Sequence, residues 1–443
     1  MARQKIILIV VITAVVLIMQ LSHVQAAPIE LSLEESIAVV LKNNPVTKLV
    51  QDDKAISAWD LAGAKAGFGP TVTFTHTDTE TNKNVFDLSG SSWESLANQF
   101  HITSSNTSDD FTSDNDIRIS LPVYTGGKVE SQVKQAKINY QVADLEASKT
   151  IQQLKLDTTT AYFAVLQSRN LLQVKQESVD NLTEHLKSVQ VQYDSGTVNK
   201  SDILRSEVEL GNTQQDLVKA QSQYDVAMVK FKKLLSLPRT NQVVLKDNLA
   251  YRQFSLTLEE CLQCAMTHRP DIAQAQAGVQ NAQEGIKLAK SQNQPQVNLN
   301  GDLDWNDSHF PGLKNGNWTV SLVASINVFD SGLTKSKMKA SEIGLAKAKE
   351  KVTQTEDVLV EEIGEAYLNL KEAEKRIKIS QSLVEKADED YKIARIRYEE
   401  GIGTNLDVID AQLAWTQAKA NYVQALYDYN VNKAVLEKAM GVI

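Results

Sequence analysis

The sequence predicts an α+β membrane protein in which a pair of β-strands followed by a long α-helical hairpin occurs twice. Three observations support this fold class. The chain contains an internal duplication, segments in which apolar and polar residues alternate, and very long proline-free stretches with a helical periodicity.

The duplication consists of two sets of residues that recur at constant displacements. One set recurs 225 residues later: residues 31–35, Pro45 and Pro70 correspond to residues 256–260, Pro270 and Pro295. The other recurs 205 residues later: Gly127, Ala161, Tyr162, Tyr193, Gly196, Asp202 and Tyr224 correspond to Gly332, Ala366, Tyr367, Tyr398, Gly401, Asp407 and Tyr429. We therefore divide the chain into a first repeat, residues 27–250, and a second repeat, residues 251–443.

Residues 1–26 have the features of a secretory signal peptide. Arg3 and Lys5 precede an apolar stretch, and a small-residue cleavage site ends at Ala26. An uncleaved anchor is the alternative. No later segment has 18 consecutive apolar residues, so we expect the mature chain to enter a membrane by strands. Without Arg3 and Lys5 the formal charge falls from −9 to −11, which argues against nucleic acid as a partner.

Each repeat begins with two short helical segments and continues into two strands. The helices are expected at residues 31–44 and 46–67, and at 256–268 and 271–292, separated by Pro45 and Pro270. Apolar residues alternate with polar ones at 72–74, 117–123, 297–305 and 317–328. An ordinary half-buried sheet has this pattern, and so does a barrel with a lipid-facing outer surface and a wet lumen.

The helical hairpins follow the strands. The stretch from Gly332 to Tyr398 contains no proline and corresponds to a helix of roughly 100 Å at 1.5 Å per residue. Its apolar residues follow the 3-4 spacing of a coiled coil from Ile363 to Tyr398, and the equivalent positions run from Thr158 to Tyr193. Glycine turns lead into shorter return helices at 199–235 and 404–440.

Four strands per chain cannot close a barrel, and open sheet edges are not tolerated in lipid. The smallest transmembrane barrels have about eight strands. Four strands from each of two chains would give a narrow barrel of eight, and from three chains a barrel of 12. We expect a homotrimer whose helices continue the wall of the barrel.

One stretch in the second repeat carries a family resemblance. It is Tyr398-Glu-Glu-Gly401-Ile-Gly-Thr-Asn-Leu-Asp407-Val-Ile-Asp410-Ala411-Gln412, followed by Ala418, Tyr422, Ala425, Tyr429, Leu436 and Gly441. The first repeat has Tyr193-Asp-Ser-Gly196 and then Asp202-Ile-Leu. With the duplication and the order of elements, the chain resembles the TolC family of outer-membrane efflux proteins, the outer-membrane factors, over essentially its whole mature length.

The resemblance implies a homotrimer with a 12-strand β-barrel in the lipid of the outer membrane and a 12-helix α-barrel in the periplasm. It also implies docking to a periplasmic adaptor and, through it, to an inner-membrane pump. The protein would then be the exit duct of a tripartite efflux or type I secretion system. Residues 78–116 and 306–316 would form outer loops, and the 20-residue difference between the repeats falls on the first of them.

The glycine turns would form the periplasmic tips. Gly196 and Gly401 are expected to end their helices in the left-handed conformation. The resemblance implies that both tips, with Gly403 and Thr404, are the adaptor-docking surface. The family has a basic residue just after the tip glycine, and this position is Gly403 here.

Four residues are candidates for the gate. Asp407 and Asp410 lie in the first turns of the last long helix, where they could stabilise the helix N-terminus, with Thr404 as a capping partner. Stacked rings of these aspartates in a trimer would instead attract cations. By resemblance, Asp202 matches a gate carboxylate and Tyr398 a tyrosine that locks the closed state. In the first repeat Arg205 replaces the second aspartate.

No catalytic, cofactor or metal site is predicted. The sequence lacks a phosphate-binding GxxxxGK[ST] loop, so nucleotide energy would come from a partner. The six histidines are scattered, and Cys261 and Cys264 are expected to form a local disulfide or to be two buried thiols. The alternative function is a non-conducting trimeric coiled-coil envelope scaffold. Within the duct function, drugs, metals, other small molecules and proteins all remain possible cargo.

Overall fold

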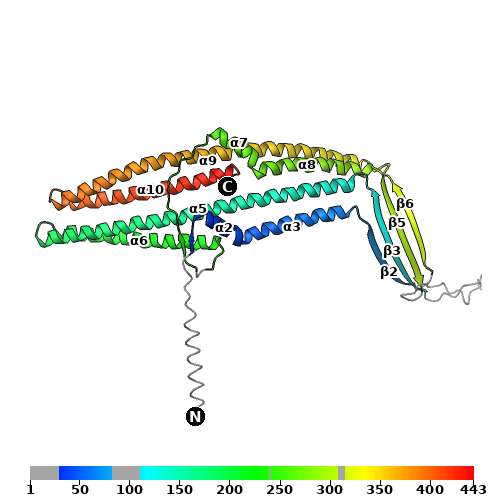
Figure 1. The fold of residues 1–443 in the computed structure, drawn as a ribbon, viewed down its shortest axis with the longest axis horizontal. Helices are drawn as coiled ribbons and strands as arrows, with labels where there is room; N and C mark the ends of the chain where they lie inside the picture. The colour runs from blue at the N-terminus through cyan, green and yellow to red at the C-terminus, as the bar shows by residue number, and fades with distance from the viewer. Residues whose placement is uncertain (1–28, 82–109, 239–240, 308–314) are drawn as a thin grey trace, which may run out of the picture. The chain divides into compact units, whose positions relative to one another are not determined.

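The computed structural model describes residues 29–81, 110–238, 241–307 and 315–443 (Figure 1). The predicted signal peptide lies outside the described residues, and so does most of the first predicted outer loop. The described chain forms two compact units. One comprises the chain up to Asp52, Leu145–Ala273 and Thr353–Ile443, and the other Asp53–Asp144 and Gln274–Val352. Each unit takes segments from both halves of the sequence, and the repeat boundary at 250/251 stays a prediction.

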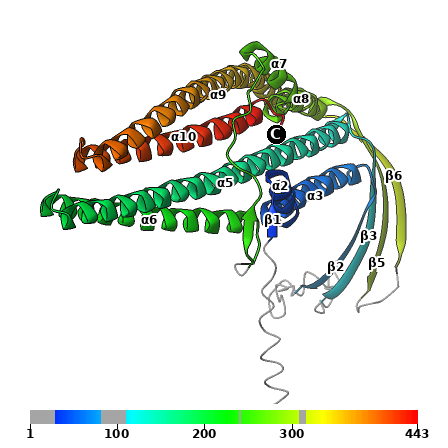
Figure 2. The same cartoon turned by 60° about the vertical axis from the view of Figure 1, so that its left-hand side comes forward.

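The second unit contains an antiparallel four-stranded sheet with the order β2-β3-β5-β6 (Figure 2). Its strands are β2 (Thr71–Thr81), β3 (Asp110–Tyr124), β5 (Gln296–Asp307) and β6 (Asn317–Ser325). Among the described strands, β2 and β6 are each paired on one side only.

Apolar and polar rows alternate across all four strands of this sheet. Phe74 is 54% exposed and Trp318 73% exposed, so the apolar rows lie on an open face. In the next row along, Arg118 is hydrogen-bonded to Asp302 across the strands at 2.6 Å. One apolar row is Phe74, Ile117, Leu303 and Trp318, and the adjoining polar row is Thr73, Arg118, Asp302 and Thr319. Because side chains alternate between the two faces of a strand, the sheet has one apolar and one polar face.

The predicted bounds of one strand and of one loop were wrong. β6 ends at Ser325 rather than near residue 328, because its antiparallel partner β5 begins at Gln296. Ser325 pairs with Gln296, and Pro295 before it has no N–H to continue the ladder. The loop predicted at 78–116 is shorter, because polar residues extend the ladder as far as Thr81 and Asp110.

The short helices agree with the predicted segments to within a few residues. They are α2 (Leu33–Asn43), α3 (Pro45–Ala66), α7 (Leu258–His268) and α8 (Pro270–Lys290), with a single 3-10 turn, η1 (Ser291–Asn293). Ser32 and Thr257 form capping boxes at the starts of α2 and α7. Pro45 and Pro270 are the first residues of the following helices, where no intrahelical N–H is needed.

The long helices confirm the predicted hairpins. α5 (Lys128–Asp194) and α9 (Leu333–Glu399) each have 67 residues, and the return helices α6 (Lys200–Leu234) and α10 (Asn405–Ala439) each have 35. The predicted seam of α9 is largely buried, as Ile363, Leu370 and Tyr398 illustrate. None of the helices in the described part of the chain is both long and apolar enough to span a bilayer.

In the first unit the two hairpins lie side by side, with α10 next to α5 in both views (Figures 1 and 2). Hydrogen bonds from Gln167 to Gln424 and from Lys419 to Glu177 join these two helices. In the middle of α5, Tyr162 is fully buried beside a short parallel pair of strands, β1 (Ile29–Leu31) and β4 (Val243–Leu245). This core joins the ends of the return helices α6 and α10 to the middle of the long helices.

The two cysteines on α7 are not joined by a disulfide. Cys261 is buried and Cys264 partly exposed, and both are free thiols. Burial raises the pKa of the Cys261 thiol, so it is a poor nucleophile. Within the described ranges, no three His, Cys, Asp or Glu side chains gather in a way that could hold a metal ion.

Candidate functional site

The candidate site lies in the first unit, at the two turns that connect the paired long helices. Gly196 and Gly401 have the predicted left-handed conformation, with φ of +79° and +74°. The N–H of Gly196 donates to Tyr193, and that of Thr197 to Gln192. Gly401 and the residue after it repeat this pair of bonds with the end of α9. Both turns are therefore Schellman motifs, which end a helix by satisfying its last carbonyl groups.

The aspartates that follow the turns cap the return helices. The N–H of Thr404 donates to the Asp407 carboxylate at 2.9 Å, and the Asp407 N–H donates to the Thr404 hydroxyl at 3.2 Å. Asp202 accepts in the same way from the N–H of Asn199, at 3.3 Å. The bonds from Thr404 hold the pKa of Asp407 below its usual range, so this exposed carboxylate stays ionised at neutral pH.

Asp407 and Asp410 line a common groove of about 430 Å³ between α9 and α10, which Asp202 does not reach. Arg397 and Asp390 of α9 lie in the same groove. The charge of Arg397 is a further, smaller cause of the lowered pKa of Asp407. The sequence analysis missed Arg397, although its place directly before Tyr398 could have pointed to it.

Gly403 also lines this groove, and a side chain at this position would be tightly confined. A β-carbon at this position would lie 3.1 Å from the backbone nitrogen of Tyr398 and 3.2 Å from the carbonyl carbon of Arg397. A basic side chain at residue 403 would therefore push against the last turn of α9. Within the groove, the positive charge comes from Arg397 instead.

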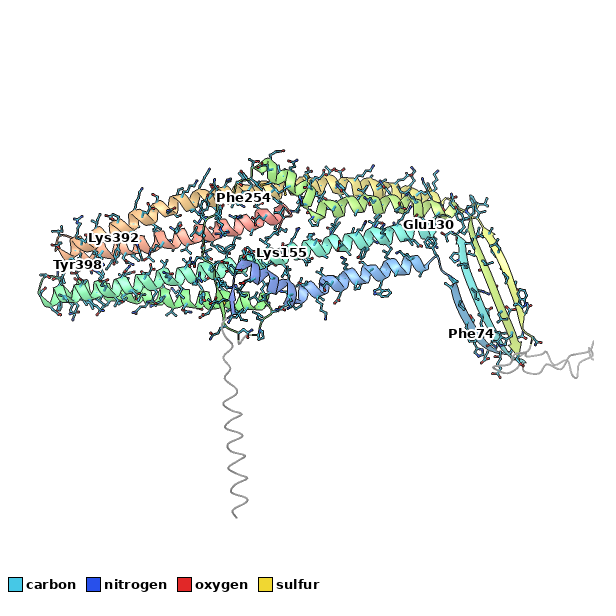
Figure 3. The ribbon with its side chains drawn as sticks, in the orientation of Figure 1. Phe74, Glu130, Lys155, Phe254, Lys392 and Tyr398 are labelled. Carbon is cyan, nitrogen blue, oxygen red and sulfur yellow. The ribbon has the colours of Figure 1, made fainter. Side chains whose placement is uncertain are left out.

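Tyr398 and its repeat equivalent Tyr193 have different environments. Tyr193 is 39% exposed, whereas Tyr398, near the end of α9 (Figure 3), is 3% exposed and packs its ring against His185 of α5 with centroids 5.0 Å apart. Burial, and then the charge of Asp202, raises the pKa of Tyr398 to about 12. The Tyr398 hydroxyl has no hydrogen-bond partner among the described residues. Tyr398 thus lies between the two hairpins.

Asn405, the first residue of α10, is a central residue that the sequence analysis missed. It is 4% exposed and is hydrogen-bonded to Asp202, Ser206 and His185. Two of these partners belong to α6 and one to α5. No local sequence signal links residues that lie about 200 positions apart, so only the fold could reveal this cluster.

The sequence was compared with known protein families. It matches the model of the outer membrane efflux protein family over residues 60–236 and 261–442. The chain belongs to the outer membrane efflux protein family.

Relatives of this outer membrane efflux protein include the outer membrane protein TolC of Escherichia coli K12, which is 20% identical over 315 residues. That match covers 68% of this chain and 64% of TolC, slightly less than two thirds of the relative. The cation efflux system protein CusC of the same organism is 22% identical over 323 residues, which cover 71% of this chain and 70% of CusC.

Solved structures of outer-membrane channels share the fold. A crystal structure of CusC has a TM-score of 0.76 at 18% identity and covers 92% of each chain. The Campylobacter jejuni CmeC outer membrane channel has a TM-score of 0.75 at 16% identity and covers 93% of this chain and 85% of CmeC. The family and its relatives place this outer membrane efflux protein in the outer membrane, extending into the periplasm.

Proposed function

We propose that this outer membrane efflux protein is the passive exit duct of a tripartite efflux or type I secretion system, formed by three copies and gated at its helical tips. The four-stranded sheet is the observation that carries the proposal. Its exposed apolar rows suit contact with lipid, and its polar face suits a wet lumen.

The edges of the sheet support assembly. β2 and β6 each have one unpaired edge within the described chain, and such edges are not tolerated in lipid. Antiparallel pairing of β6 with β2 of the next copy would close three sheets of four strands into a barrel of 12. The same three copies would bring 12 long helices together as an α-barrel.

The tips support the proposed partners and gate. Gly196, Gly401, Gly403 and Thr404 lie in or beside the turns, where a periplasmic adaptor protein would dock and connect the duct to an inner-membrane pump. In a trimer Asp407 and Asp410 would form two negative rings at the narrow end, next to Asp202 and Tyr398. The relatives are named for cargoes as different as solvents and cations, which fits a duct whose cargo is chosen by the pump.

A non-conducting trimeric coiled-coil scaffold is the alternative from another class. It would explain the buried seams of the helices. It would not explain why each hairpin pairs a long helix with a shorter antiparallel one, or why both hairpins have matching glycine turns. Both functions involve binding and assembly rather than catalysis, and we propose no enzymatic activity.

Selectivity recordings test the proposed gate. In planar bilayers, Asp407→Ala combined with Asp410→Ala should reduce cation selectivity and weaken block by multivalent cations, because two carboxylates per chain leave the groove. The control is Glu389→Ala with Glu400→Ala, which removes the same charge from exposed positions outside the groove. Unchanged selectivity in the first variant, or an equal change in the control, would remove these aspartates from the gate.

A further inference from the structure

Asn405 lies at the centre of a buried polar cluster. The side-chain Nδ2 of Asn405 donates to the backbone carbonyl of Asp202 at 3.0 Å. Its Oδ1 lies 3.1 Å from the Ser206 hydroxyl and 2.6 Å from Nε2 of His185. One amide group of α10 therefore joins α6 and α5, the two helices of the other hairpin.

The chemistry of the partners fixes the orientation of this amide. The carbonyl of Asp202 can only accept a hydrogen bond, so Nδ2 of Asn405 must face it. Oδ1 must then accept from both Ser206 and His185. His185 consequently carries a proton on Nε2, and burial lowers its pKa, which favours the neutral ring. Each of the three bonds to Asn405 therefore has a defined donor and acceptor.

The side chains of the cluster are buried. His185 is 4% exposed and Ser206 is 1% exposed. Apolar side chains from all four long helices pack at this end of the hairpins, among them Val189, Ile203, Tyr398 and Val408. A buried amide that loses its partners without reaching water is strongly unfavourable. Separation of the hairpins therefore requires the bonds to break and the cluster to become hydrated.

The cluster has no equivalent in the repeat. A displacement of 205 residues places Lys200 at the position of Asn405, Asp390 at that of His185 and Ala411 at that of Ser206. These three side chains cannot make the same set of bonds. The repeats also differ at the tip tyrosine, because Tyr398 is buried and Tyr193 is exposed. The link is thus specific to the two hairpins of one chain.

We propose that Asn405 is the latch residue that holds the two hairpins of each chain together when the tip is closed. Gly403 itself has no side chain that could provide such a restraint. The latch rests on the proposed function of a tip-gated duct. It adds the contacts that must break before the two hairpins separate: those of the Asn405 amide with Asp202, Ser206 and His185.

The test measures the open probability of the purified full-length assembly in planar bilayers, together with amide hydrogen exchange over residues 398–408. Asn405→Leu has a similar volume and no hydrogen-bonding group, and we expect it to raise the open probability at least about tenfold and to speed exchange. The matched control is Lys200→Leu, at the equivalent first residue of α6, which should behave like the wild type in both measurements.

A crosslink provides the complementary variant. Ser206→Cys with Asn405→Cys, in a chain whose Cys261 and Cys264 are replaced by serine, should restore the connection as a disulfide. Oxidation is then expected to lower the open probability to the wild-type level, and a reductant should raise it again.

The outcomes separate the latch from the duct. If neither the wild type nor any variant carries current, but amide hydrogen exchange is faster in Asn405→Leu alone, the proposed duct is wrong and the latch between the hairpins is supported. If open probability and exchange in Asn405→Leu match the wild type, or if Lys200→Leu changes them equally, the latch is overturned. A channel that stays fully active when the disulfide is formed would also overturn it.

Discussion

At the scale of single residues, the candidate site contains local and non-local features, and only the local ones could be predicted from the sequence. Asp407 and Thr404 are three positions apart, so their capping box could be predicted from residue types and spacing alone. Asn405 and His185 are 220 positions apart, and no pattern in the sequence pairs them. The tertiary fold alone brings such pairs together.

His185 has charged neighbours on more than one helix. Glu184 of α5 and Glu399 of α9 lie in the same small pocket, with Arg395 between them at 3.9 and 3.8 Å from their carboxylates. Burial is the largest effect on the His185 pKa and lowers it, while the bond from Asn405 and the charge of Glu399 act in the opposite direction. Asn181 and Ser188 of α5 and Tyr398 of α9 line the same pocket.

The lowered pKa predicts that acid favours an open tip. A closed tip keeps His185 buried and neutral, whereas an open tip exposes it and returns its pKa towards about 6.5. The closed state is therefore fully stable above about pH 6.5 and loses stability as the pH falls towards the lowered pKa. We expect the open probability to rise by up to about tenfold per pH unit for each chain between pH 7 and pH 5.

His185→Gln is the control for this pH response, because the glutamine amide can still donate to Asn405 but does not titrate. Its open probability should stay nearly flat over the same range, since carboxylates titrate mainly at lower pH. An equally steep response in His185→Gln would assign the titration to another group.

At the scale of elements, helices and turns were predicted closely because their signals are local. Capping residues, proline at first helical positions and glycine after the last turn fix the bounds of α2, α7 and both hairpins. The strands were predicted less well at their ends. The end of β6 depends on where β5 begins, and polar threonine and aspartate residues in β2 and β3 are strand residues only because they pair with each other.

The tip turn offers a prediction at this scale. Gly401 has φ of +74° and open space around its missing β-carbon, so Gly401→Ala adds backbone strain without a clash. We expect the free energy of local opening at the tip, measured by native-state hydrogen exchange, to fall by about 1–2 kcal/mol.

Gly364, inside α9, serves as the matched control because it also has open space and has an ordinary helical φ. Gly364→Ala should leave protection at the tip unchanged and stabilise its own helix by about 0.5–1 kcal/mol. If the free energy of local opening at the tip fell no more in Gly401→Ala than in Gly364→Ala, the left-handed turn would not limit the stability of the tip.

At the scale of the whole molecule, the structure confirms the four predicted strands of the sheet and the two long hairpins per chain, and it adds the short pair β1 and β4, which was not predicted. The number of copies could not be derived in the same way. Free edges on β2 and β6 call for partners in lipid, but they suit any number of chains that closes a barrel. Family membership supports three copies, and the two repeats would then give 12 strands and 12 long helices with approximate sixfold symmetry.

The chemical differences between the repeats would distinguish the contacts within a chain from those between neighbouring chains. Contacts within a chain and contacts between neighbouring chains would be equivalent if the repeats were identical. Asn405 with His185, against Lys200 with Asp390, makes the two kinds of contact chemically different at the tip. A tube built from nearly identical helical hairpins could then close through the contacts within each chain and assemble through the contacts between chains.

The conductance of the purified wild-type protein in a planar bilayer tests the proposed duct most directly. A three-copy duct with acidic residues at its narrow end should give discrete, cation-selective single-channel currents. Protein that inserts into the bilayer and carries no current, at pH 7 and at pH 5 alike, would contradict the duct and favour the scaffold.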